Sequence, residues 1–165
     1  MSAKEQVTLT YRALIFGGGF WQKLVHSPCQ NDRHSYWLHK LNKKMESAQK
    51  KTGPIFKKFI EELAEKYGQK GPDGKPIMAG NGLPQAEPSQ RDAYDDMLDE
   101  FMQKTVTLDF DKLPLEFFAH IGKTPMDWEP LEQVAEVSPA KLEEDDKARK
   151  NAHESLRALQ GGQAG

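Results

Sequence analysis

The sequence has little that would cross-link the chain or embed it in a membrane. It contains one cysteine, Cys29, which excludes an intrachain disulfide and is typical of proteins from a reducing compartment. No apolar run approaches the roughly 20 residues that a membrane-spanning helix needs, and the first residues lack the apolar core of a secretory signal. We therefore expect a protein without a membrane anchor, used inside a cell or packed into a particle made there.

Apolar residues are also scarce. They make up 37% of the 165 residues, and 29% are charged, whereas about 45–50% apolar is typical of globular domains. This composition predicts a small core built from elongated helices rather than a thick sandwich of sheets. The length fits one domain, or one domain with an appendage.

Signatures of phosphate binding are missing as well. Gly17-Gly18-Gly19 has neither the spacing of a dinucleotide fingerprint nor that of a P-loop. The residues that follow, Phe20 and Trp21, offer no hydroxyl or lysine for a phosphate. We interpret the glycines as a hinge, or a tightly bent linker, between Phe16 on one side and Phe20-Trp21 on the other.

No pattern of catalytic or metal-binding residues is evident. His26, Cys29, His34 and His39 are zinc-compatible ligand types within fourteen residues, but their spacing fits no zinc site. The acidic stretch RDAYDDMLDEF has neither a glycine nor a glutamate at the positions that a calcium-binding loop requires, and no nucleophile elbow is present. We therefore expect no enzymatic activity, no metal, no cofactor and no small-molecule substrate.

Charge is unevenly distributed along the chain. Residues 1–58 contain eleven basic and three acidic residues, although the whole chain has a net charge of −2. Such asymmetry occurs in nucleic-acid-binding proteins, and also where two halves attract each other within a fold or between subunits. Arginine is scarce and base-reading patterns are missing, so nucleic acid is the alternative rather than the favoured partner. The residues of this alternative are Arg33, Lys40, Lys43, Lys44, Lys50 and Lys51.

A long amphipathic helix is predicted over residues 32–67. Apolar residues recur there at steps of three and four, which places them on one helix face. Asn31 is a good N-cap residue and Gly68 a good terminator. The apolar stripe keeps its phase across Gly53-Pro54, which favours a kinked helix or a nearly collinear pair of helices. The stripe consists of Leu38, Leu41, Met45, Ala48, Thr52, Ile55, Phe59, Leu63 and Tyr67.

The remaining patterns predict a mainly α fold with a small β element (α+β). A short second helix is expected over 89–104, and a small antiparallel sheet or hairpin from residues 7–12, 74–78 and 105–110. Pro72-Asp73-Gly74 is a turn signal. Residues 124–137 look extended, and Ser138-Pro139 begins a C-terminal helix. We thus predict a helical core domain over 1–123, and an extended arm with the C-terminal helix over 124–165.

Large apolar residues are the candidate contacts with a protein partner or with a second copy of the chain. We expect most of them to lie in the core and one or two to make contacts. The candidates are Phe16, Phe20, Trp21, Trp37, Trp128, Leu156 and Leu159.

The order of these features resembles a family of small, functionally uncharacterised proteins of tailed bacteriophages and prophages. The matching pieces are RALIFGGGF, NDRHSYWLHKLNKKMES, FIEELAEKYGQKGPDGKPI and YDDMLDEFMQKTVTLDFDKLPLEFF, which together cover about residues 9–118. The resemblance implies a phage origin and a small accessory or virion-associated role, in the host cytoplasm or in the virion. It supplies no catalytic residues. It fits a protein that acts through protein contacts, as an oligomer or docked on a larger assembly.

Overall fold

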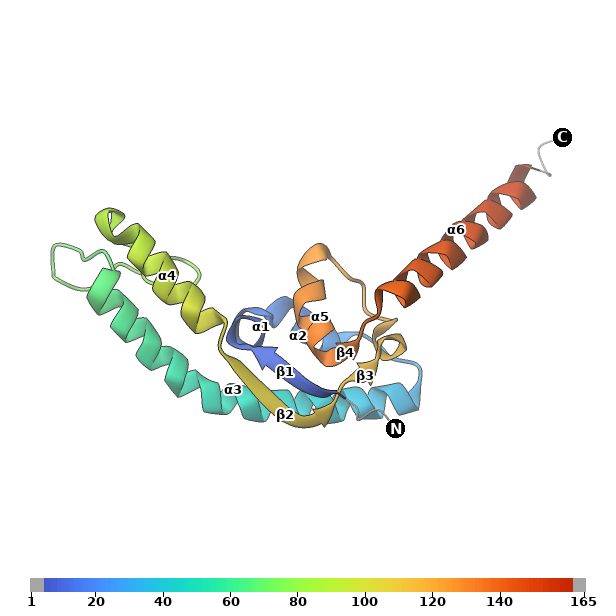
Figure 1. The fold of residues 1–165 in the computed structure, drawn as a ribbon, viewed down its shortest axis with the longest axis horizontal. Helices are drawn as coiled ribbons and strands as arrows, with labels where there is room; N and C mark the ends of the chain where they lie inside the picture. The colour runs from blue at the N-terminus through green and yellow to red at the C-terminus, as the bar shows by residue number, and fades with distance from the viewer. Residues whose placement is uncertain (1–4, 162–165) are drawn as a thin grey trace.

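The computed structural model describes the backbone of residues 5–161 (Figure 1). Within the C-terminal helix it describes the side chains at positions 143, 144, 147, 148, 150, 151 and 153–159. The fold is mainly α with a small β element. The α-helices are α1 (Tyr11–Phe16), α2 (Gly18–His26), α3 (Asp32–Tyr67), α4 (Arg91–Met102), α5 (Trp128–Val134) and α6 (Pro139–Gly161). The strands are β1 (Gln6–Thr10), β2 (Thr105–Asp111), β3 (Leu113–Pro114) and β4 (Ala135–Glu136), and short 3-10 turns are η1 (Pro88–Gln90), η2 (Leu115–Phe118) and η3 (Pro125–Asp127).

Helix α3 forms the base of the molecule. Its 36 residues span about 54 Å at 1.5 Å per residue. The side chain of Asn31 caps it by accepting a hydrogen bond from the His34 backbone, and the helix continues through Pro54, as the phase of the stripe predicts. One stripe residue was wrongly assigned. Ile55 is 47% exposed, and the partly buried Phe56 packs toward α4 in its place.

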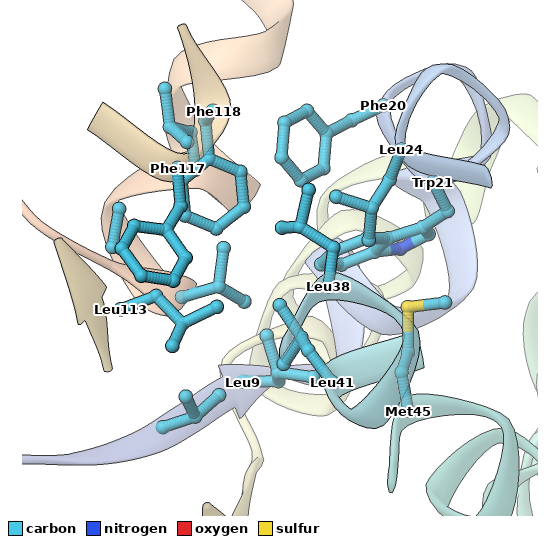
Figure 2. Packing of buried hydrophobic residues seen from close by; sticks show 14 of the residues in the cluster. Leu9, Phe20, Trp21, Leu24, Leu38, Leu41, Met45, Leu113, Phe117 and Phe118 are labelled. Atoms are coloured by element: carbon cyan, nitrogen blue, oxygen red, sulfur yellow. The ribbon is translucent and has the colours of Figure 1, made fainter. Parts of the chain in front are cut away.

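Two hydrophobic clusters lie along α3. The larger one joins the N-terminal half of α3 to α2, β1, β2, η2 and α5, and Figure 2 shows Phe20 and Trp21 of α2 meeting Leu38 of α3 there. The smaller one lies between the C-terminal half of α3 and α4. In it the rings of Phe59 and Phe101 stack with centroids 3.9 Å apart.

Over residues 5–161 the β element consists of two small two-stranded sheets. Strands β1 and β2 pair antiparallel, with Thr10 opposite Thr105 and an irregularity between Gln6 and Thr8. The short β3 and β4 pair parallel. Residues 74–78, which we predicted to join the sheet, instead lie in a loop held by isolated bridges such as Lys70–Pro76. Two prolines in this loop, Pro76 and Pro84, have no backbone N–H to donate to a ladder.

The prediction of an extended segment over 124–137 is wrong. These residues form η3, α5 and β4. Leu131, Val134 and Ala135 are fully buried in the same cluster as Val7 and Leu9. The chain therefore packs with the core well past the predicted boundary at residue 123. The part that projects is α6, which leaves the body of the molecule as a single helix (Figure 1).

The glycine run forms a junction between two helices. Gly17 ends α1 and begins α2, while Gly18 and Gly19 belong to the first turn of α2. A Cβ at position 17 would overlap the Ala13 carbonyl oxygen and lie 2.9 Å from Nε1 of Trp21. A Cβ at 18 or 19 would meet open space. The sharp bend therefore requires glycine at the first of the three positions.

Candidate functional site

The structure divides the predicted contact residues into core and surface. Phe20 and Trp21 are 2% and 4% exposed, and Trp128 is partly buried against the main cluster. Because Phe20 and Trp21 are core residues, they offer no surface to a partner. The exposed candidates are Phe16, Trp37, Leu156 and Leu159.

Trp37 lies at a groove of about 450 Å³, which we call the aromatic groove. Residues of α3, β2, β3, η2 and β4 line it, so it forms only when distant parts of the chain come together. Its apolar lining is Trp37, Phe110, Leu113, Pro114 and Phe117. Trp37 is 42% exposed, which leaves a large apolar face open to a ligand.

Ring contacts fix the position of Trp37. Its ring meets those of Tyr36 and Phe110 edge to face, with centroids 5.6 and 6.2 Å apart. The ring of Phe117, which lines the groove, stacks on that of His34 with centroids 4.1 Å apart. Aromatic pairs in such geometries are worth about 0.5–1.5 kcal/mol each beyond burial. The exposed tryptophan is therefore held in place before any partner arrives.

The rim of the aromatic groove is charged. Arg33 lies over the Phe117 ring at 5.9 Å, and Lys112 forms an ion pair with Glu5 at 3.2 Å. The carboxylates on the rim are Asp109, Asp111 and Glu136. None of these three forms an ion pair with another side chain that the structure describes. An apolar floor beneath such carboxylates suits a segment that presents apolar side chains together with basic ones.

The predicted lysine face of α3 is present and solvated. Lys40, Lys43, Lys44, Lys50 and Lys51 are all exposed. Their only ion pair with another described residue joins Lys43 to the nearby Glu46, at 3.7 Å. The acidic residues of the other half do not neutralise this face within the described chain.

Contacts between the basic and acidic halves lie elsewhere. Arg12 is 3.8 Å from Glu129, and Nζ of Lys23 is 2.6 Å from the nearly buried carboxylate of Asp127. Burial acts to raise the pKa of Asp127, but hydrogen bonds from Lys23 and Thr124 hold it below its usual value. These pairs fasten η3 and α5 to α1 and α2, which is a structural role.

The histidine and cysteine cluster is divided between two places. Cys29 and His39 line a small cleft of about 230 Å³ together with His120, whereas His34 stacks on Phe117. Nε2 of His120 is buried and has no hydrogen-bond partner among the residues that the structure describes. Burial, with smaller contributions from Lys123 and His34, lowers the pKa of His120. Among the described residues no three side chains of His, Cys, Asp or Glu come together as metal ligands.

Phe16 lines a second groove, of about 430 Å³, between α1, α4 and the segment around Met126. Its ring meets Phe56 edge to face at 5.9 Å. Met126 is 87% exposed. Fewer aromatic residues line this groove than line the one beside Trp37. Arg12 and Glu129, which form an ion pair, lie at its side.

Sequence reasoning missed most of the aromatic groove. Phe110 and Phe117 were not among the predicted contact residues, because alternation along a strand tells which residues share a face but not which helix covers them. The carboxylates Asp109 and Asp111 were not singled out. The sequence pointed to these carboxylates only through the stretch TLDFDK, in which polar residues alternate with Leu108 and Phe110.

Comparison of the chain with protein-family models, with curated proteins and with solved structures gives no match. The resemblance to phage proteins over about residues 9–118 stays a prediction. No helix within the described residues is long and apolar enough to cross a bilayer.

Proposed function

We propose that this chain is a non-enzymatic accessory or virion-associated protein of a tailed bacteriophage or prophage. It acts through contacts with protein, as an oligomer or docked on a larger assembly, in the host cytoplasm or in the virion. The observation that carries the proposal is α6. Its 23 residues stand apart from the body, and every one of its described side chains is exposed, including Leu156 at 58% and Leu159 at 70%.

A helix that packs against nothing in its own chain becomes more stable when a partner covers it. Most helical stability in proteins comes from packing of an apolar face rather than from intrinsic propensity. Burying a leucine side chain releases about 1.5–3 kcal/mol. Leu156, Leu159 and the half-exposed Trp37 together therefore offer several kcal/mol to a protein that covers them.

The experiment is capture of the tagged full-length chain from infected or induced cells. We expect one phage protein, or the chain itself, to be retained in fixed ratio. Trp37→Ala, or Leu156→Ala with Leu159→Ala, reduces the retained amount. Val25→Ala is the matched control, since Val25 is also exposed, at 53%, but lies outside the aromatic groove. Equal retention by all variants, or no retained protein, contradicts the proposal.

Nucleic-acid binding is the second candidate, favoured by the unneutralised lysine face of α3. Each phosphate contact made by a lysine releases counterions, so binding weakens steeply with salt. A gel shift with duplex DNA and with single-stranded RNA, repeated over a salt series, tests this role. Lys50→Gln with Lys51→Gln then weakens binding and lowers the salt slope, whereas Lys70→Gln, on the loop after α3, changes neither. No shift at low salt removes the candidate.

A further inference from the structure

We propose that two copies of this chain exchange their C-terminal helices. In the exchange, α6 of each copy runs antiparallel beside α6 of the other and places Leu156 and Leu159 at the aromatic groove of the other copy. The inference deepens the proposed function and rests on it, because it names the partner that α6 contacts as a second copy of the chain.

The aromatic groove and the end of α6 have matching chemistry. The groove combines an apolar floor around Trp37 with three carboxylates, which outnumber its two cations, Arg33 and Lys112. The carboxylates are those of Asp109, Asp111 and Glu136. The part of α6 from residue 147 onward presents the exposed Leu156 and Leu159 and carries four basic residues against one acidic residue. Apolar side chains flanked by basic ones are the ligand that such a groove favours.

The helix cannot reach the groove of its own chain. Glu136 lines the groove, and α6 begins at Pro139, directly beside it. Leu156 then lies about 26 Å further along the helix axis at 1.5 Å per residue. Figure 1 shows α6 leading away from the body. A second copy must therefore supply the leucines.

An antiparallel pair meets this requirement by symmetry. When two helices of equal length lie antiparallel, the C-terminal end of each lies beside the N-terminal end of the other. The N-terminal end of α6 adjoins the aromatic groove. A two-fold axis makes both contacts identical. The exchange thus fills both grooves with one kind of contact and leaves no open end.

The charge pattern of α6 favours the antiparallel direction. Residues 139–146 contain four carboxylates and one lysine, whereas residues 147–161 contain the four basic residues and one glutamate. An antiparallel pair sets the acidic part of one helix against the basic part of the other. A parallel pair aligns like charges, which disfavours it.

The first test is the mass of the full-length chain by light scattering over a concentration series. We expect a species of twice 18.7 kDa. Leu156→Ala with Leu159→Ala, and separately Trp37→Ala, raise the dimer dissociation constant about tenfold or more, as loss of central apolar contacts does. Val25→Ala leaves it unchanged. Circular dichroism of each variant confirms that the fold is retained.

The second test determines the direction of the helices. In a Cys29→Ser background, copies with Glu136→Cys are mixed with copies with Leu159→Cys and treated with a short bismaleimide. We expect crosslinks between the two kinds of copy. Lys44→Cys, on the exposed face of α3, is the control that stays uncrosslinked with Leu159→Cys. Crosslinking of Leu159→Cys copies to one another alone indicates a parallel pair and overturns the proposal.

The outcomes separate this inference from the broader function. A chain that stays monomeric overturns the exchange. If that monomer still captures a phage protein through Leu156 and Leu159, the proposal of a protein contact stands and α6 serves a different protein. If it captures nothing, both are wrong.

Discussion

Replacing Gly17 by alanine tests the packing of the N-terminal helices most sharply. The added Cβ would overlap the backbone oxygen of Ala13 and lie 2.9 Å from Nε1 of Trp21. That oxygen accepts hydrogen bonds from the Gly17 backbone and from the Trp21 indole, both at 2.9 Å. Relief of the overlap requires α1 or the buried Trp21 ring to move, and the indole N–H then loses its acceptor.

The expected loss follows from these contacts. A buried donor without a partner costs about 1–3 kcal/mol, and forced rearrangement of a packed core costs about 1–3 kcal/mol more. We expect Gly17→Ala to lower the free energy of unfolding by about 2–5 kcal/mol in urea titrations followed by tryptophan fluorescence and circular dichroism.

The two neighbouring glycines provide matched controls. Positions 18 and 19 lie in the first turn of α2 with open space around a Cβ. Alanine there leaves the stability unchanged or raises it by up to about 1 kcal/mol, since alanine is the better helix former. Equal losses at positions 17 and 18, or an unchanged stability for Gly17→Ala, would refute the reasoning.

Three further predictions concern stability. Lys23→Met leaves the carboxylate of Asp127, which is 4% exposed, without its ion-pair partner, and urea titration should show a loss of about 1–3 kcal/mol. Burial lowers the pKa of His120 below 6.5. Because the unfolded chain therefore binds this proton at a higher pH than the folded chain does, thermal stability should fall as the pH drops below 6.5. His120→Gln should make this fall in thermal stability smaller. Because the pKa of Asp127 is held below 3.8, a second loss of thermal stability is expected as the pH drops below 3.8 and this carboxylate is protonated. Phe101→Ala removes the ring stacked on Phe59 and should lower the unfolding free energy by about 3–5 kcal/mol by the same titration. A loss below about 1 kcal/mol for Phe101→Ala, or an unchanged pH profile for His120→Gln, contradicts these assignments.

The long helix was the most predictable part of the fold. Its stripe of apolar residues extends over many turns, so errors at single positions do not change the conclusion. Ile55 shows the limit. It continues the spacing of three and four, yet it lies at 47% exposure because α4 packs against the neighbouring Phe56 and Phe59 instead. The position of α4 around the helix axis is a tertiary fact that no local pattern contains.

Short elements were harder to predict, and α5 shows why. The sequence WEPLEQV lies in the segment predicted to be extended, yet it forms a helix that contains Pro130. Proline is tolerated in the first turn of a helix, where the backbone N–H has no acceptor within the helix. Pro130 is the third residue of α5. The turn at Gly74, by contrast, was correctly predicted, and its φ of 77° is one that glycine adopts without strain.

Only a few residues of the candidate site could be predicted from the sequence, and the way the groove is assembled could not. Trp37, Leu156 and Leu159 were named from residue type and helical spacing, and they are exposed. The aromatic groove depends on how β2 and η2 lie over the start of α3. That arrangement brings together residues about 75 positions apart in the chain, such as Trp37 and Phe110, and periodicity alone carries no information about it.

Amide hydrogen exchange of residues 148–159 in the full-length chain, measured over a dilution series, tests the central claim most directly. We predict protection of these amides at high concentration, because a covered helix opens only with its partner contact. The protection is lost on dilution and in Trp37→Ala. Fast exchange of residues 148–159 at every concentration, equal in Trp37→Ala and in the unaltered chain, would contradict the account.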